Sequence, residues 1–285
     1  MSRARNWSRR LLSSSAIGGA YALTALALVP LALVLWYVIA NGLPAAARLD
    51  FYVNVERPVG IPGAGVAHAI AGTAVMVGIA SLIAVPIGVI GGVNLVEFTG
   101  RLAGLVRLAA DVLVGAPSIV IGLFAYVLFV APFHHFSGLA GALALAVLML
   151  PVVVRTTEGA VGIVPSGLRE AGLALGLPRW RVALQLVLPA AAPGVITGAL
   201  LAIARAAGET APLLFTGFGN RFWNLDPTQP MSALPLIVFH DALTPYPSLQ
   251  QQAWGAALVL VVAMLVINLA SRAVLGRRLR QAGRL

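Results

Sequence analysis

The sequence predicts an all-α membrane protein with six transmembrane helices, and three observations support this: its composition, its charge-free runs and the placement of its arginines. Of its 285 residues, 60% are hydrophobic and only 10% are charged, whereas a soluble domain has about 45–50% apolar and about 25% charged residues. A soluble monomer cannot bury so much apolar surface. We therefore expect a chain that spans a membrane several times.

Long runs without charged residues locate the helices, because a membrane-spanning helix needs about 20 mostly apolar residues. Five such runs occur, and the third, 112–154, carries Pro132, His134, His135 and Gly138 in its middle. We expect this run to form two spans that are joined by a tight hairpin. The six expected helices cover 16–40, 66–95, 106–130, 138–157, 190–214 and 253–275.

The arginines predict the orientation, since short cytoplasmic loops are enriched in Lys and Arg. All nineteen basic residues are arginine, and one of them, Arg205, falls inside the fifth span. Only Arg48, Arg57 and Arg221 lie on one side of the membrane, and the other fifteen share a side with both chain ends. We therefore expect both termini in the cytoplasm. The net charge of +10 then reflects topology and contact with membrane lipid, and we expect no nucleic acid partner.

Missing residue types exclude several function classes. Without lysine the chain cannot form a Walker A nucleotide loop. Without cysteine it has no disulfides, iron–sulfur clusters or thiol nucleophiles. No Ser/His/Asp signature, carboxylate pair or metal-ligand spacing stands out, and neither large loop is long enough for a catalytic domain. We expect no catalytic residues, no metal site and no cofactor held by this chain.

The cytoplasmic loop near 158–189 is predicted to contain two short amphipathic helices. Pro165 and Ser166 favour a helix start, Gly176 suits a left-handed end, and Pro178 suits the start of a second helix that runs to Pro189. Apolar residues occupy one face of each helix, so polar side chains such as Arg169 and Glu170 are expected to point elsewhere. Periodicity alone favours equally a helix pair on the membrane surface and a docking element for a cytoplasmic partner.

Residues of this loop resemble the EAA loop of ABC importer permeases. The matching residues are Glu170, Ala171, Gly172, Gly176 and the segment Leu186 to Pro189. Gly172 in place of Ala and Leu186 in place of Ile are mild departures from the family pattern. The resemblance implies the type I (MetI-like) ABC importer permease fold. It also implies that Glu170, Ala171, Gly172 and Gly176 contact an ATPase, with Gly176 at the corner between the helices.

Two further segments, 115–123 and 205–216, resemble the phosphate-specific importer permeases of the PstA type. The resemblance implies a bacterial inner-membrane subunit that pairs with a PstC-like permease, a PstB-like ATPase dimer and a PstS-like phosphate-binding protein. ATP and Mg would then be bound by the partner ATPase. Two alternatives stay open: a permease for another oxyanion (molybdate, sulfate or phosphonate), and a non-transporting membrane scaffold that recruits a cytosolic protein.

These expectations divide the chain into three parts. Residues 1–65 hold the N-terminal cytoplasmic segment, the first helix and an external loop. Residues 66–275 form the type-1 permease core with the coupling loop 158–189, and residues 276–285 form a basic tail. In the external loop of the core, the apolar run 231–239 is too short to span the bilayer. We expect it to be interfacial or re-entrant, or to be part of an aromatic belt.

Arg205 and Glu209 are the two charged residues of the fifth span, four positions apart and therefore on one helical face. A lone charge at a helix centre costs about 2.5–3.5 kcal/mol on insertion scales, so we expect both to face the bundle interior. One interpretation is a structural ion pair. The other is a substrate pathway in which Arg205 meets the passing oxyanion and Glu209 holds its guanidinium.

Two more residues are candidates for this pathway. Thr210 follows Glu209 in a segment where Gly208 and Pro212 are expected to loosen the helix and free backbone groups toward a cavity. Ser118 follows Pro117 in the third span, where a broken helix would turn its N-terminus toward an anion.

Overall fold

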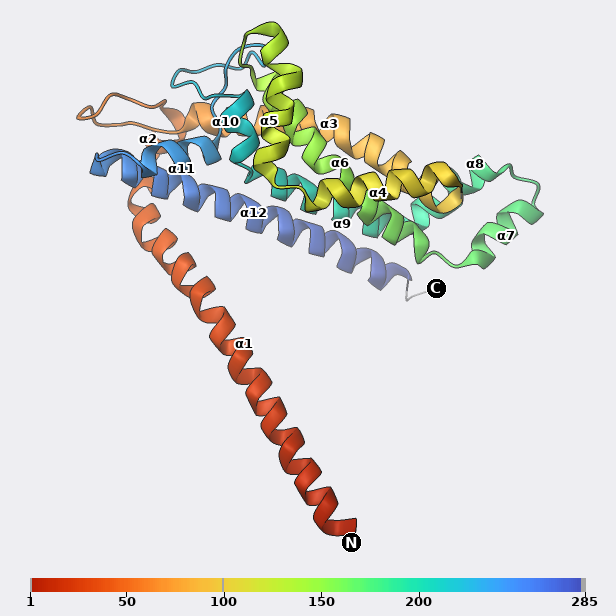
Figure 1. Ribbon diagram of the computed structural model, residues 1–285. Coiled ribbons are helices and arrows are strands. Elements are labelled where there is room, and N and C mark those ends of the chain that lie inside the picture. Colours follow the sequence, from red (N-terminus) through yellow and green to blue (C-terminus); the bar gives the residue numbers. More distant parts are fainter. Residues whose placement is uncertain (1, 99, 283–285) are drawn as a thin grey trace.

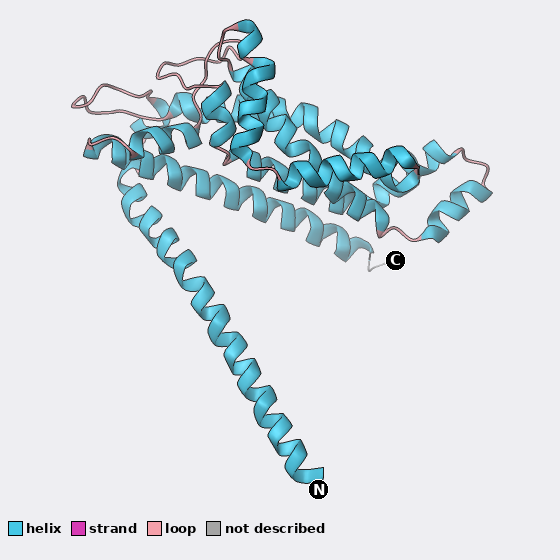
Figure 2. Ribbon diagram, in the orientation of Figure 1, coloured by secondary structure: helices cyan, strands magenta, loops and turns pink. Residues whose placement is uncertain are grey.

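The computed structural model describes residues 2–98 and 100–282, and these are mostly helical (Figures 1 and 2). The helices able to cross a membrane lie in α1 (Ser2–Ala46), α3 (Ala67–Glu97), α6 (Gly138–Gly162), the continuous stretch Arg179–Ala207 and α12 (Pro247–Ala282). A bent pair, α4 (Arg101–Gly115) and α5 (Ser118–Phe129), is together long and apolar enough for a sixth span. The prediction of six spans therefore holds when the bent pair counts as one.

The core of the bundle forms where α3 and α6 pack side by side. Gly88 and Gly92 of α3 let α6 approach so closely that a Cβ at either position would lie 2.7 or 2.6 Å from the side chains of Val153 or Thr157. Small residues at helix interfaces allow such close packing in membranes. Met76, Leu145, Met149 and other buried residues continue this core toward the opposite end of the bundle.

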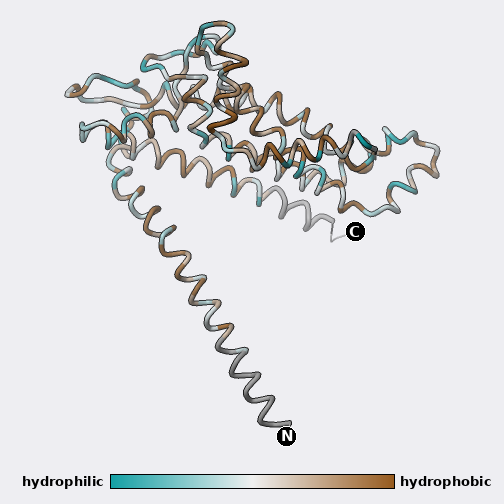
Figure 3. Tube along the Cα trace, in the orientation of Figure 1, coloured by the Kyte–Doolittle hydropathy of each residue, from teal (hydrophilic) through white to brown (hydrophobic). Residues whose placement is uncertain are grey.

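Helix α1 points away from the bundle (Figure 1). Its C-terminal part contacts the N-terminal part of α12. Tyr37 meets Trp254 edge-on at 5.3 Å between ring centroids, and Gly42 packs against Trp254 and Leu258. The helix is longer than the predicted 16–40, and hydrophobic residues run along it (Figure 3). Its large apolar side chains from Ile17 to Leu43 are mostly exposed. In a membrane protein, that surface faces lipid or another subunit.

The span expected over 106–130 is broken at Pro117, where the sequence predicts a broken helix. The chain breaks at Ala116–Pro117, and α4 and α5 meet at an angle of 110° (Figure 1). Pro117 lacks a backbone N–H, and it biases the preceding residue away from the helical region. Ala116 is accordingly extended, with φ −71° and ψ 137°. Helix α5 therefore begins at Ser118 within the bundle.

The bounds predicted for the fifth span, 190–214, are wrong at both ends. Helix α8 (Arg179–Arg181) continues through the π-helical segment η2 (Val182–Val187) into α9 (Leu188–Ala207), so the helix passes Pro189 instead of ending there. A wider π turn tolerates the hydrogen bond that a proline cannot donate. At its other end α9 stops at Ala207, and a separate helix, α10 (Ala211–Thr216), follows.

The remaining elements are short. They are α2 (Asp50–Val53), the 3-10 turn η1 (Ala131–Phe133), α7 (Ser166–Ala174) and α11 (Leu234–Ala242). The run 231–239 is packed inside the protein, because Met231, Leu234 and Leu236 are each no more than 4% exposed. Helix α11 packs against α12 and α3, so this run completes the core at its end of the bundle.

Candidate functional site

Arg205 and Glu209 form an ion pair at the end of α9, with 3.4 Å between Arg205 Nε and Glu209 Oε1. The side chain of Glu209 is 17% exposed, whereas that of Arg205 is 53% exposed. The expectation that both groups face the bundle interior therefore fails for Arg205, whose guanidinium faces outward from this chain's own helices.

The depth of this ion pair in the membrane determines which surroundings suit the exposed guanidinium of Arg205. Gly208 packs against Met264, which lies near the middle of the spanning part of α12, Pro247–Ala273. Arg205 is thus exposed near the centre of the membrane, where facing lipid costs about 2.5–3.5 kcal/mol. A polar environment from outside this chain is the favourable alternative.

The breaks in the third and fifth spans meet one another. Gly122, one turn after Ser118, lies against the start of α10, where an added Cβ would be 2.8 Å from Pro212 Cα. Thr210 precedes α10 and is half-buried, as is Ser118. The structure thus brings the segments of Ser118 and Glu209–Thr210 together. No hydrogen bond joins Ser118 to Arg205 or Glu209 among the described residues.

The predicted coupling residues lie on and just after α7, which projects beyond the ends of α3 and α6 (Figure 1). Gly176 has φ +78°, which confirms the predicted left-handed helix end. The N–H groups of Gly176 and Leu177 donate to the carbonyls of Leu173 and Gly172 at 2.9 and 3.2 Å, the paired hydrogen bonds of a Schellman motif.

The other three predicted coupling residues differ in their surroundings. Gly172 is buried, and a Cβ there would lie 2.7 Å from Leu186 Cδ1 and 3.0 Å from Val182 Cγ2. Glu170 and Ala171 are exposed. The small residue therefore fits α7 onto η2, and the two exposed residues are free to touch another protein.

Arg169 does not point away from the bundle as expected. Its Nε lies 2.8 Å from Glu97 Oε1 at the end of α3, and its two other nitrogens donate to the carbonyls of Val164 and Val161 at 2.7 and 3.0 Å. One side chain therefore ties α7 to the ends of α3 and α6. Basic residues often cap the last carbonyls of a helix, but local spacing gives no sign of a carboxylate 72 residues away.

A second ionic group at the α7 end of the bundle was also not predicted. Glu158 of α6 accepts from Arg107 and Arg155, both at 2.5 Å, and Arg155 also pairs with Asp111 at 2.8 Å. These contacts hold α4 against α6. The first half of the broken span is thus anchored to the bundle, and α5 carries the other half toward α10.

At the opposite end, Asp241 and Glu56 line a cavity of about 230 Å³ together with Arg221 and His240. Glu56 pairs with Arg221 at 3.2 Å, whereas Oδ2 of Asp241 is buried without a hydrogen-bond partner among the described residues. Burial, aided by the charge of Glu56 and opposed by Arg221, raises the pKa of Asp241 to about 7.

Asp241→Asn is expected to remove part of the pH dependence of stability. Because the folded chain holds this proton up to about pH 7 while the unfolded chain releases it near pH 4, the free energy of unfolding falls as pH rises between these values. The variant should therefore unfold at a higher temperature than the parent at pH 8 and at a similar temperature at pH 4. Thermal unfolding in detergent across this range checks the prediction, and parallel pH curves would contradict it.

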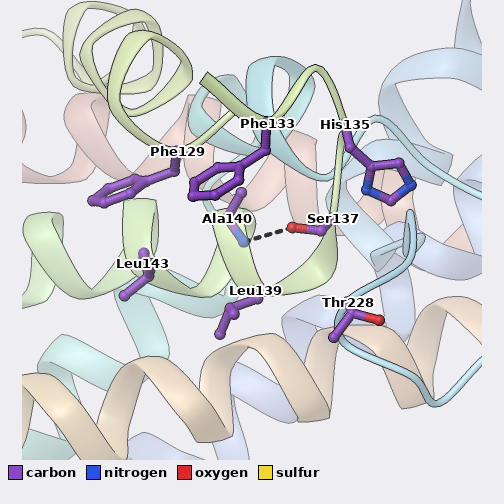
Figure 4. Close-up of a pocket in the computed structure, with 8 residues that line it drawn as sticks. All are labelled: Phe129, Phe133, His135, Ser137, Leu139, Ala140, Leu143 and Thr228. Carbon is purple, nitrogen blue, oxygen red and sulfur yellow. Dashed lines mark hydrogen bonds between the residues drawn. The ribbon is translucent and has the colours of Figure 1, made fainter. Parts of the chain in front are cut away.

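A further cavity at this end, of about 280 Å³, is apolar (Figure 4). Phe129, Phe133, Leu139 and Leu143 line it, while Ser137 Oγ is occupied in accepting the N–H of Ala140 at 3.1 Å. None of the predicted site residues contributes to it.

The fold is similar to a solved structure of the MetNI methionine ABC transporter, with a TM-score of 0.62 at 19% identity over 74% of this chain and 94% of the other. A second crystal form of MetNI gives a TM-score of 0.53 at 16% identity, covering 85% and 96% of the two chains. At these identities the likeness establishes the fold, which is the predicted type I (MetI-like) permease fold.

Sequence relatives include the phosphate transport system permease protein PstA of Yersinia pestis, 43% identical over 81% of this chain and 79% of the relative. PstA of Xylella fastidiosa is 44% identical over 84% of both chains. PstA 1 of Mycobacterium tuberculosis is 42% identical over 92% and 87%. Residues 84–280 match the family model described as binding-protein-dependent transport system inner membrane component. The chain therefore belongs to this family of multi-pass membrane permeases, among the PstA proteins.

Proposed function

We propose that the chain is a permease subunit of an ATP-driven importer of inorganic phosphate, in which it forms the translocation pathway together with a second permease. The similarity to PstA proteins of phosphate transport systems supports phosphate as the substrate. The observation that carries the pathway is the half-exposed guanidinium of Arg205 at mid-membrane depth. A second permease facing Arg205 would supply the polar environment that lipid cannot.

The pathway is assigned to Arg205, Glu209, Thr210 and Ser118. A guanidinium binds phosphate oxygens through charge-assisted hydrogen bonds. Glu209 stays within 3.4 Å of Arg205, so it competes with the anion and keeps binding weak enough for release. The helix breaks at Pro117 and Gly208 leave irregular backbone inside the membrane, which is tolerated where it is buried in protein or lines a cavity.

The energy source must lie on another chain, because this one has no lysine for a Walker A loop. We assign Glu170 and Ala171 to contact with a PstB-like ATPase dimer that holds ATP and Mg, and we assign Gly172 and Gly176 to shaping the coupling element that presents them. The other partners are a PstC-like permease, which makes the heterodimer, and a PstS-like phosphate-binding protein at the external face. Both termini and α7 then lie in the cytoplasm of a bacterial cell, beneath its inner membrane.

Movement of the ATPases would reach the bundle through α7. Arg169 links this helix to α3 and α6, and Gly172 seats it on η2, which continues into the helix that carries Arg205. A displacement of α7 is therefore passed to three spans at once. This supports alternating access to the Arg205 region.

Arg169→Gln is expected to lower phosphate uptake several-fold while ATP hydrolysis continues, because α7 loses its charged link to α3. Glu97→Gln removes the same ion pair from the other side and should have a similar effect. ATPase and uptake rates of the reconstituted transporter measure the coupling. Arg101→Gln, which changes an exposed arginine near the same end of the bundle, is the control. Equal uptake per ATP in all three variants would contradict this assignment.

Uptake competition distinguishes phosphate from other oxyanions. In cells that depend on this transporter for phosphate, excess sulfate, molybdate or phosphonate should leave uptake of labelled phosphate unchanged. Preferential uptake of one of these anions would replace the substrate assignment. A chain that recruits a cytosolic protein but supports no uptake even when the partner permease, ATPase and binding protein are all present would favour a scaffold.

A further inference from the structure

An apolar groove lies between α3 and the helix that follows the coupling loop. We call it the α3–α8 groove. It has a volume of about 420 Å³, and its lining residues are Val89, Ile90, Val93, Asn94, Phe98, Trp180, Ala183, Leu184 and Leu188. Trp180 and Leu184 are 53% and 50% exposed. No segment of the described chain fills the groove.

The groove crosses from the hydrocarbon region into the headgroup region. Helix α3 has 31 residues, which makes it about 46 Å long, whereas the hydrocarbon core is about 30 Å thick. About five residues at each end of α3 therefore lie among the headgroups. Val89 and Ile90 are at acyl-chain depth, while Asn94 and Phe98 are near the interface, where tryptophans such as Trp180 are enriched.

The interfacial end of the groove is basic. Trp180 is flanked by Arg179 and Arg181, both exposed, and Arg181 Cζ lies 5.2 Å from the centroid of the Trp180 ring. The nearby carboxylate of Glu97 is 13% exposed and is paired with Arg169. Two exposed cations thus stand at the headgroup level without an opposing exposed carboxylate among the groove residues.

We infer that the α3–α8 groove binds one anionic phospholipid, with an acyl chain along α3 and the phosphate of the headgroup at Arg179 and Arg181. An apolar trough that ends in cations matches the two parts of such a lipid. The groove is partly formed by η2, against which Gly172 of the coupling helix α7 packs. A bound lipid would therefore support the seat of α7 and make coupling depend on membrane composition.

Because the chain has no cysteine, Leu184→Cys introduces one labelling site at the rim of the groove. The full chain carrying a bimane label there is assembled with cysteine-free partner subunits in phosphatidylcholine vesicles. Brominated phosphatidylglycerol or brominated phosphatidylcholine is then added at equal mole fraction. Leu82→Cys is the control, an exposed leucine in the middle of α3 with no basic residue within two helical turns along the chain.

At Leu184→Cys, phosphatidylglycerol should quench at several-fold lower mole fraction than phosphatidylcholine. A basic residue near an anionic lipid contributes about fivefold in affinity, the equivalent of about 1 kcal/mol. The preference should disappear in Arg179→Gln/Arg181→Gln and be absent at Leu82→Cys. Equal quenching by both lipids at Leu184→Cys would overturn the proposal. Quenching by neither lipid would show that protein covers the groove, and it would overturn the proposal as well.

Discussion

Replacing Arg205 with alanine is expected to abolish phosphate uptake while the protein remains inserted in the membrane. Charge-assisted hydrogen bonds contribute about 1.5–3 kcal/mol each, so removing the one guanidinium exposed in this region predicts a loss of at least about tenfold. Uptake of labelled phosphate by starved cells, with immunoblotting of the membrane fraction, measures both quantities. Arg48→Ala removes an exposed arginine outside the pathway and should leave uptake unchanged.

A companion variant separates the pathway from a structural ion pair. Glu209→Gln removes the carboxylate that lies 3.4 Å from Arg205 Nε but leaves the guanidinium in place. If Arg205 meets the anion, this variant should keep its folded stability and bind phosphate more tightly, with slower release. If the pair only joins helices, both variants should lower stability together. Wild-type uptake by Arg205→Ala would exclude the pathway assignment.

Gly176→Val is expected to uncouple ATP hydrolysis from transport. Gly176 has φ +78°, and the left-handed region costs an ordinary residue about 1–2 kcal/mol, with a further penalty for a β-branched side chain. The substitution should therefore open the corner after α7 and displace Glu170 and Ala171. Stimulation of ATP hydrolysis by loaded binding protein, measured together with uptake in proteoliposomes, gives the coupling ratio.

Two variants control for the size of the new side chain. Gly167→Val alters the same loop at a position where φ is ordinary and an added Cβ meets nothing within 4 Å, so it should remain coupled. Gly176→Asn should recover much of the coupling, since asparagine tolerates the left-handed conformation. An intact coupling ratio in Gly176→Val would refute the corner as a required element.

Local sequence signals predicted much of this arrangement. Proline and glycine marked the left-handed corner at Gly176, and charge-free runs placed the long spans. Two other prolines had opposite outcomes: Pro117 breaks a span by 110°, as expected, whereas the helix expected to end at Pro189 continues through it by way of a π turn. The difference depends on how neighbouring helices satisfy the freed backbone groups, and no single sequence reveals this.

Local sequence patterns do not predict contacts between segments that are far apart in the chain. The pairing of Arg169 with Glu97 joins residues that are 72 positions apart, and the network around Glu158 joins α4 to α6. Periodicity places a charged residue on a helix face but does not say which other helix meets that face. The sequence did not predict the outward exposure of Arg205 for the same reason. This chain alone does not complete the surface around that residue.

Transport of phosphate by this chain can be measured by reconstituting it with a PstC-like permease, a PstB-like ATPase and a PstS-like binding protein in ATP-loaded proteoliposomes. We expect accumulation of labelled phosphate that requires ATP and this chain, and that falls at least about tenfold with Arg205→Ala. Accumulation that persists when this chain is omitted, or that serves sulfate or molybdate in place of phosphate, would contradict this expectation.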